Sequence, residues 1–216
     1  MIRSPFTQRK PQDFRILMVY PNTQMNSLMP QNIGVFTALL KNVGYKLDLF
    51  DLSFYQDFHF DMNKEDLSDE EMKEKNRSQL IYDVDELLKK GGAPKTTNFK
   101  DDFVKKIQEF RPDLILVSVV ESSWFLAVDL LDSVPEKDRK YKTLFGGVFA
   151  TFGSEKMIKN KHVDYVCRGE GEEPLIEMCN RLISGGRIDD VQNLTIKADG
   201  QIYRNKIRAG MDINTV

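Results

Sequence analysis

The chain has 216 residues, enough for one compact domain with an elaboration or for two small domains, and we start from one domain. Its 31 Lys and Arg residues nearly balance its 33 Asp and Glu residues, so no basic excess indicates a nucleic acid or an anionic membrane as partner. Two cysteines are too few for a disulfide framework, and the first residues lack the apolar stretch of a secretory signal, so we expect a cytoplasmic protein.

Predicted strands and helices alternate along most of the chain. Short apolar runs predict five strands, at 15–21, 46–52, 113–120, 142–147 and 163–169. Apolar residues at helical spacing predict helices at 32–45, 101–110, 123–132, 154–160 and 174–186. This order is typical of a parallel sheet with helices on both faces, and five such units predict a doubly wound, flavodoxin-like or Rossmann-like α/β fold.

Two segments fall outside this alternation. Residues 53–98 are highly charged and carry a helical stripe, which predicts a charged helical insert between the second strand and its crossover helix. Residues 193–205 contain two strand-like halves around Asp199 and Gly200, which is a strong signal for a β-hairpin. We therefore expect a five-stranded parallel sheet with a charged helical insert and a C-terminal β-hairpin.

Residues of an unusual kind follow four of the predicted strands, in the segments 20–30, 118–124, 146–152 and 168–174. The carboxyl ends of parallel strands meet at one edge of a sheet, and ligands of such folds bind beyond that edge. We therefore expect these four segments to lie on one rim and to form a ligand site.

Gly146 and Gly147 form a pair after the fourth strand. They permit the close approach of a flat or extended ligand, although a tight turn is the simpler explanation for a glycine pair taken alone. The segment 168–174, RGEGEEP, places carboxylates at the N-terminus of a helix, where they would repel an anionic phosphate. Neither GxGxxG nor GxxxxGK[ST] occurs, so we set aside nucleotide folds of these two types.

The histidines and cysteines do not predict a metal site. His59 and His162 are expected to be solvated loop residues, since metal sites gather several ligands. Cys167 and Cys179 are expected to be inert core thiols, and the absence of CxxxCxxC excludes the usual three-cysteine loop for an iron–sulfur cluster. Trp124, near the end of the third strand, is either a platform for a ligand or a packing residue.

Five segments together resemble a known family. In this order and spacing they are similar to the N-terminal cobalamin-binding domain of cobalamin-dependent radical S-adenosylmethionine enzymes: RILMVYP, MPQNIGVFTALLKNVGY, RPDLILVSVVESSW, LFGGVFATF and VDYVCRGEGEEPLIEM. The likeness covers nearly the whole chain. It implies a cobalamin-binding α/β domain at 1–190, and at 191–216 a hairpin and linker that lead toward a missing radical S-adenosylmethionine domain.

The wider cobalamin-binding fold is marked by DxHxxG after the first strand, SxL after the third and GG after the fourth. Ser118 begins an SxV version of the second motif, and Gly146 and Gly147 match the third, but no histidine follows the first strand. Asp57 and His59 copy part of DxHxxG after the wrong strand, so we reject His59 as the lower axial ligand of cobalt. Because radical members of the family commonly lack this histidine, the resemblance implies base-off cobalamin without an axial histidine.

In this fold the detached nucleotide tail of cobalamin threads between sheet and helices, and the resemblance implies that Gly146, Gly147 and Ser118 make room for it. The cofactor-binding residues that we expect all follow the strands: Asn22, Thr23, Ser118, Val120, Glu121, Ser122, Trp124, Gly146, Gly147, Val148, Phe149, Arg168, Gly169, Glu170 and Gly171. We expect no catalytic residue and no metal ligand in this chain. S-adenosylmethionine and an iron–sulfur cluster are expected only in the missing domain.

Two functions from different classes remain open. The leading hypothesis is a cobalamin-binding domain, in cis or in trans to a radical S-adenosylmethionine domain of a methyltransferase or a carbon-skeleton biosynthetic enzyme, with neither nucleic acid nor membrane as partner. Alone, it would bind and not catalyse. The alternative is a degenerate, cofactor-free domain for protein interaction or scaffolding, since the histidine is missing and Phe149 and Phe152 stand beside the glycines. A flavin-binding domain is less supported, because no Ser/Thr-rich phosphate loop follows the first strand.

Overall fold

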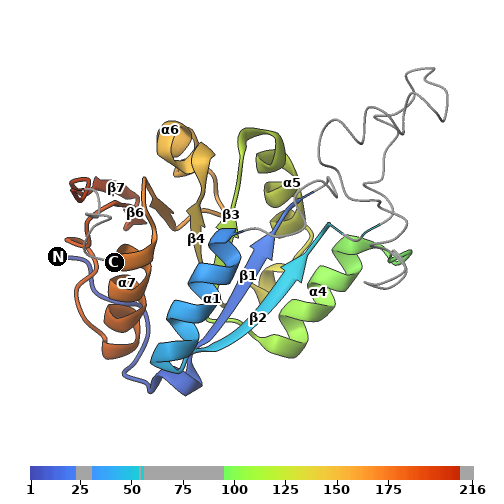
Figure 1. The fold of residues 1–216 in the computed structure, drawn as a ribbon, viewed down its shortest axis with the longest axis horizontal. Coiled ribbons are helices and arrows are strands. Elements are labelled where there is room, and N and C mark those ends of the chain that lie inside the picture. The colour runs from blue at the N-terminus through green and yellow to red at the C-terminus, as the bar shows by residue number, and fades with distance from the viewer. Residues whose placement is uncertain (23–30, 54, 56–94, 210–216) are drawn as a thin grey trace.

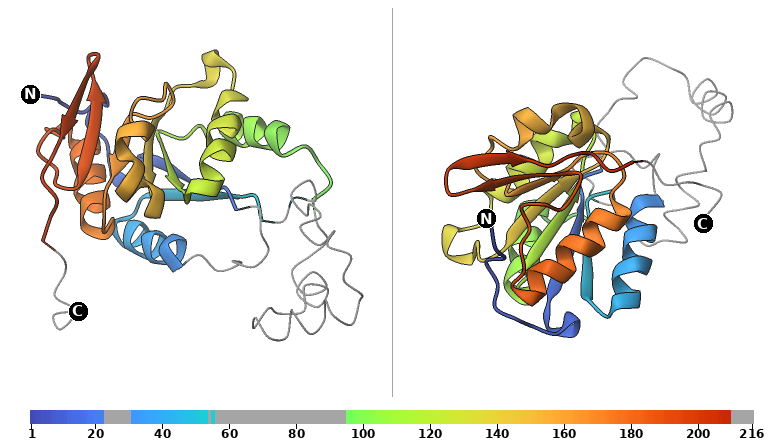
Figure 2. Two further views of the ribbon diagram at one scale, coloured as in Figure 1. Left: turned by 90° about the horizontal axis from the view of Figure 1, so that it is seen from above. Right: turned by 90° about the vertical axis from the view of Figure 1, so that its left-hand side faces the viewer.

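The fold is a seven-stranded sheet, in the order β2-β1-β3-β4-β5-β6-β7, with helices on both faces (Figures 1 and 2). The structure, a computed structural model, describes residues 1–22, 31–53, 55 and 95–209. The strands are β1 (Arg15–Tyr20), β2 (Lys46–Asp51), β3 (Leu114–Ser118), β4 (Lys142–Gly146), β5 (Tyr165–Cys167), β6 (Leu194–Ala198) and β7 (Gln201–Arg204). The helices are α1 (Gln31–Val43), α4 (Phe99–Phe110), α5 (Glu121–Asp132), α6 (Val148–Met157) and α7 (Glu172–Ser184), with short 3-10 helices η1 (Pro11–Asp13) and η4 (Glu136–Asp138).

The first five strands run parallel, and their order, β2-β1-β3-β4-β5, confirms the predicted doubly wound fold class. The predicted hairpin also forms, with φ values of 50° at Asp199 and 73° at Gly200 in its turn. The hairpin does not stand apart from the sheet. Strand β6 pairs antiparallel with β5, with Leu194 opposite Cys167, so the sheet is mixed and has seven strands.

Helix α6 begins earlier than predicted, at Val148 rather than at residue 154. Gly147 has a φ of 93° and turns the chain directly from β4 into the helix, so the apolar residues that follow form its first turn. Most of the expected helical insert, residues 56–94, lies outside the described residues. Within the described ranges, no helix is long and apolar enough to cross a membrane.

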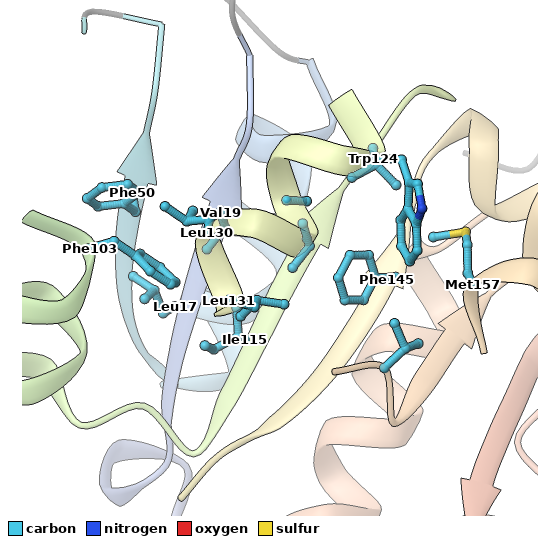
Figure 3. Packing of buried hydrophobic residues seen from close by; sticks show 14 of the residues in the cluster. Leu17, Val19, Phe50, Phe103, Ile115, Trp124, Leu130, Leu131, Phe145 and Met157 are labelled. Carbon is cyan, nitrogen blue, oxygen red and sulfur yellow. The ribbon is translucent and has the colours of Figure 1, made fainter. Parts of the chain in front are cut away.

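Side chains of the strands alternate between two apolar cores, one on each face of the sheet. On one face, Leu17 and Val19 of β1 pack with residues of α4, α5 and α6, as the close view in Figure 3 shows for part of this core. On the other face, Ile16 and Met18 pack with residues of α1 and α7. Helices α1 and α7 therefore share one face of the sheet, and the other three long helices share the opposite face.

His162 is buried, so the expectation of a solvated loop histidine is wrong for this residue. Its side chain is 5% exposed, and its Nε2 atom lies 2.8 Å from a carboxylate oxygen of Asp132. Its carbonyl oxygen accepts a hydrogen bond from the hydroxyl of Thr143, near the amino-terminal end of β4. Burial lowers the pKa of His162 below its usual value, and the Asp132 carboxylate offsets only part of that effect.

We predict that His162→Gln weakens the pH dependence of folding stability below about pH 6.5. Because the pKa of His162 is lowered by folding, the unfolded chain takes up this proton first, and stability declines as the pH falls from about 6.5 toward the lower folded value. Urea denaturation at about pH 7.5 and about pH 5.5 measures the effect. The variant should lose less stability than the wild type between these pH values, and an equal loss would contradict the prediction.

Candidate functional site

A cavity of about 660 Å³ lies at the carboxyl ends of the parallel strands, between α1, α6 and α7. Its floor is apolar and consists of Met18, Leu116 and Leu144 from β1, β3 and β4, which all point to the face that α1 and α7 cover. The helices that follow β3 and β4 pack on the opposite face. The strand order therefore leaves the ends of β3 and β4 uncovered on the face that α1 and α7 share. The cavity lies there, between these two helices.

Gly146, which ends β4, and Gly147, which precedes α6, have different roles. A Cβ atom at Gly146 would meet no atom of the described residues within 4 Å, so the absent side chain leaves open space in the cavity wall that these residues form. Gly147 has a φ of 93°, and a Cβ atom there would lie 2.6 Å from the backbone oxygen of Val119. Of the two explanations considered for the pair, the tight turn therefore applies to Gly147, while the close approach of a ligand at Gly146 stays a prediction.

Ser118 ends β3 and is held by a residue of α1. The Asn32 side-chain amide donates to Ser118 Oγ at 2.6 Å, while the Asn32 Oδ1 atom accepts the backbone N–H of Ile33. Both polar side chains line the cavity. They therefore form a small polar edge between an apolar floor and the start of α1.

The loop 168–171, between β5 and α7, forms another wall of the cavity and is held from two sides. The Thr151 hydroxyl of α6 accepts a backbone N–H of this loop at 3.0 Å, and the Asn193 side-chain amide donates to the carbonyl of Glu170 at 2.8 Å. At the start of the loop, burial raises the pKa of the Cys167 thiol to about 12. The thiol is therefore protonated at neutral pH, although it lines the cavity.

Glu172, at the start of α7, brings a carboxylate to the cavity. Its Oε2 atom is buried and has no hydrogen-bond partner within the part of the chain that the structure describes. A buried acceptor without a partner is costly, so this oxygen favours a ligand that offers an N–H or O–H group. Among the same residues, no three His, Cys, Asp or Glu side chains form a group that could hold a metal ion.

Large apolar side chains are exposed at the same end of the strands. Val148 and Phe152, one turn apart on α6, are 65% and 85% exposed and also line the cavity. Val120 after β3 and Phe125 on α5 are 50% and 69% exposed. We call these four residues the apolar rim. A group of exposed large apolar side chains is typical of a surface that a ligand or a partner covers.

The structure divides the predicted site residues into two groups. Those that line the cavity are Ser118, Gly146, Gly147, Val148, Gly169, Glu170 and Gly171. Those described outside its lining are Asn22, Val120, Glu121, Ser122, Trp124, Phe149 and Arg168. Thr23 lies outside the described residues, as does His59.

Trp124 belongs to the hydrophobic core. It is 4% exposed and packs against Phe145 and Phe149, with ring centroids 5.4 Å and 5.9 Å away. Of the two roles considered for Trp124, the structure therefore favours packing over a platform for a ligand. Arg168 also turns away from the cavity, since its guanidinium donates to the backbone carbonyl of Asn205.

Several residues of the cavity were not predicted from the sequence. They come from the strand floor and from the helices around it: Met18, Gln31, Asn32, Ile33, Phe36, Leu116, Val117, Leu144, Thr151, Phe152, Cys167, Glu172 and Leu175. The apolar members have the same sequence pattern as core residues. Thr151, Phe152 and Glu172 lie in the segments 146–152 and 168–174, which were expected to form the ligand site, although they were not named individually. The polar side chains at the start of α1 follow the predicted rim segment 20–30 directly, and this position could have identified them.

Comparisons with known proteins agree with this fold. Residues 79–178 match the family model described as the B12 binding domain. No curated protein matches the sequence at a significant level.

Two solved enzymes share the fold. The radical S-adenosylmethionine methyltransferase TsrM from Kitasatospora setae, with cobalamin and a [4Fe-4S] cluster bound, gives a TM-score of 0.59 at 15% identity, over 90% of this chain and 29% of that chain. The cobalamin-dependent S-adenosylmethionine radical enzyme OxsB, with aqua-cobalamin and S-adenosylmethionine bound, gives 0.60 at 17% identity, over 91% of this chain and 22% of that chain. This chain thus spans less than a third of the length of either enzyme. The resemblance indicated by the sequence is confirmed: the chain has the α/β fold of a B12 binding domain, and it resembles cobalamin-dependent radical S-adenosylmethionine enzymes in that fold.

Proposed function

We propose that this chain binds cobalamin in the base-off form, with the nucleotide tail in the cavity and the corrin ring over the apolar rim. The observation that carries the proposal is Gly146, whose missing side chain opens the cavity wall at the end of β4. The match of residues 79–178 to the B12 binding domain supports the same ligand.

The residues of the cavity fit the chemistry of this cofactor. The floor of Met18, Leu116 and Leu144 offers apolar contact to the flat benzimidazole base of the tail. Asn32 can donate and accept hydrogen bonds. The Oε2 atom of Glu172, which has no partner among the described residues, can accept one from a ribose hydroxyl or a side-chain amide of cobalamin. Bound cobalamin supplies cobalt chemistry, while the chain holds it, orients it and keeps water away.

The partner in this proposal is a radical S-adenosylmethionine domain, in cis or in trans, of a methyltransferase or a carbon-skeleton enzyme. That domain would hold S-adenosylmethionine and the iron–sulfur cluster, and residues 191–216 would form the hairpin and linker toward it. The described chain has no catalytic residue in this scheme. A cytoplasmic location belongs to the same proposal.

The exposed rim also favours a second function, a cofactor-free domain whose rim contacts another protein. Phe152 is 85% exposed, which suits a protein interface as well as a corrin ring. Ultraviolet–visible spectra after mixing with hydroxocobalamin, followed by gel filtration, separate the two functions. A cobalamin spectrum that travels with the protein supports the first, and free cobalamin supports the second.

We predict that Gly146→Val lowers the affinity for hydroxocobalamin at least about tenfold while the protein stays folded. The new side chain would enter open space in the cavity wall and occupy room that the ligand needs, and among the described residues its Cβ atom would meet no other atom within 4 Å. Equilibrium dialysis measures the affinity, and circular dichroism measures the fold. Wild-type affinity in a folded variant would contradict the proposed position of the tail.

Gly147→Val is the matched comparison, and we predict a different result. The positive φ and the 2.6 Å approach to the Val119 oxygen should lower the free energy of unfolding by about 2 kcal/mol or more, whether or not ligand is present. Urea denaturation measures this loss. A variant with unchanged stability would show that the turn does not require glycine.

We also predict that bound cob(II)alamin has no histidine nitrogen on its lower face. His162 is buried beside Asp132 near the amino-terminal ends of the strands, away from the cavity. The sequence gives no other histidine except His59, which follows the second strand. Electron paramagnetic resonance tests this, since an axial nitrogen splits the cobalt lines into triplets. Triplets that disappear in His59→Ala would overturn the assignment.

A further inference from the structure

Asn193 is a buried polar residue behind the cavity loop 168–171, and it does not line the cavity. It is 3% exposed and has a φ of 68°, a backbone conformation in which few residues other than glycine are found and for which asparagine is one of the best suited. A residue held in this conformation inside the protein depends on the hydrogen bonds around it. The hydrogen bonds of Asn193 connect it to two parts of the chain, the cavity loop and the segment 205–208.

The first set of hydrogen bonds connects Asn193 to the cavity loop 168–171. The Asn193 side-chain amide donates to the Glu170 carbonyl at 2.8 Å, and the Asn193 carbonyl accepts the backbone N–H of Arg168 at 3.0 Å. The Cys167 thiol also points to the Glu170 carbonyl, with 3.9 Å between sulfur and oxygen. Asn193 therefore fixes the loop that forms one wall of the cavity.

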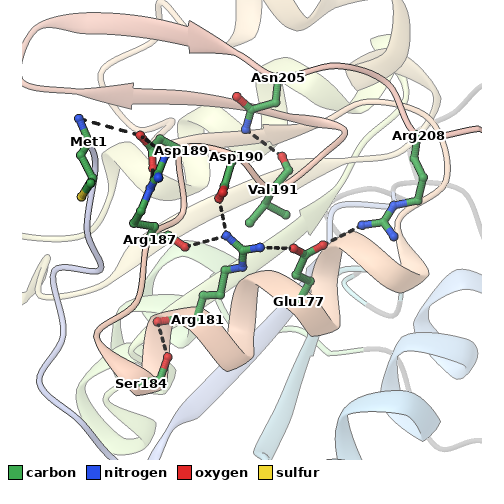
Figure 4. A network of polar contacts seen from close by, with 10 residues as sticks. All are labelled: Met1, Glu177, Arg181, Ser184, Arg187, Asp189, Asp190, Val191, Asn205 and Arg208. Atoms are coloured by element: carbon green, nitrogen blue, oxygen red, sulfur yellow. Dashed lines mark hydrogen bonds and ion pairs between the residues drawn. The ribbon is translucent and has the colours of Figure 1, made fainter.

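The second set of hydrogen bonds connects Asn193 to the segment 205–208, which follows β7. The Asn193 Oδ1 atom accepts the backbone N–H of Arg208 at 2.6 Å, and the backbone N–H of Asn193 donates to the carbonyl of Lys206 at 2.9 Å. Arg208 then pairs with Glu177 of α7 at 2.6 Å (Figure 4). The same planar side chain thus holds the cavity loop with its nitrogen and this segment with its oxygen.

We propose that Asn193 is a positioning residue that couples occupancy of the cavity to the order of the segment 205–208. Nitrogen and oxygen of one carboxamide cannot move independently, so a displacement of the cavity loop changes the bond to Arg208. By linkage, a ligand that fixes the loop also fixes the segment, and a change in the segment alters the affinity for the ligand by the same factor. This coupling rests on the proposed binding of cobalamin in the cavity.

One variant separates the two side-chain bonds, and a second removes both. Asn193→Asp keeps an oxygen acceptor for Arg208 but, as a carboxylate at about pH 8, has no donor for the Glu170 carbonyl. Asn193→Gly removes both side-chain bonds and tolerates the positive φ, so it serves if the buried carboxylate prevents folding. Asn205→Ala is the matched control. It removes a comparable bond, from the Asn205 amide to the Val191 carbonyl at 2.7 Å (Figure 4), without a side-chain contact to the loop.

Hydrogen–deuterium exchange of the full chain, with and without hydroxocobalamin, tests the coupling. In the wild type and in Asn205→Ala, the ligand should slow exchange at least about threefold in both the loop 168–171 and the segment 205–208. In Asn193→Asp and Asn193→Gly, the ligand should slow exchange of the segment less than in the wild type, because only the backbone bonds of residue 193 and the bond from Arg168 to the Asn205 carbonyl still join the segment to the loop. In both variants the loop itself should be protected only at higher ligand concentration. Equal slowing of the segment in wild type and both variants, or no slowing of the segment in the wild type while the loop is protected, would overturn the proposal.

Alkylation of Cys167 gives a second measurement that needs no ligand. Loss of the bond to Glu170 should loosen the loop, so iodoacetamide should modify Cys167 at least about threefold faster in both Asn193 variants than in the wild type or Asn205→Ala. Cys179, which is fully buried, serves as the internal reference. Equal Cys167 rates would overturn the role of Asn193. A third result separates the two proposals: Cys167 reacts faster in the variants, but hydroxocobalamin neither binds nor changes exchange in any protein. Asn193 then positions the loop as proposed, while the proposed function and the coupling that rests on it are both wrong.

Discussion

The junction of β3, β4 and α6 is the contact on which the cavity depends. The Val119 N–H donates to the Gly146 carbonyl at 3.0 Å, and the Phe149 N–H donates to the Val119 carbonyl at 3.3 Å. Gly147 can make the turn between them because it has no side chain to strike the Val119 backbone. These bonds join the ends of two strands to the first turn of α6, and within the described part of the chain they leave Gly146 facing open space. The opening in the wall is thus a consequence of how the backbone pairs.

The floor of the cavity is continuous with the hydrophobic core. Met18, Leu116 and Leu144 line the cavity, yet they are only 2%, 8% and 5% exposed. Because this floor has little water-accessible area to lose, a ligand would gain hydrophobic stabilisation mainly from burying its own apolar surface. That favours a ligand with a flat apolar group and gives little advantage to a small polar one.

Strand and helix patterns were enough to predict the parallel sheet, the hairpin and the rim at which the cavity lies. They were not enough to show that the hairpin joins the sheet, because the pairing of β5 with β6 depends on contacts between residues that are far apart in the sequence. The burial of His162 was missed and the role of Trp124 was left open, although both are buried. A single polar or aromatic residue near a strand end can face either the core or the solvent, and its sequence context does not say which. Asn32 was missed because a polar residue at a helix start is ordinary capping until its partner, Ser118, is known.

The two helices that flank the cavity differ in charge, and this difference constrains how a ligand lies. The first turn of α7 holds Glu172 and Glu173. Arg208 pairs with Glu173, while the Oε2 atom of Glu172 has no hydrogen-bond partner in the described chain. The first turn of α1 has no acidic residue and offers the Asn32 amide instead. Helix N-termini favour negative charge unless carboxylates already occupy them. A ligand that carries both an anionic group and hydrogen-bond donors would therefore place the anion toward α1 and the donors toward Glu172, and a free nucleotide with several phosphates would have no comparable place at α7.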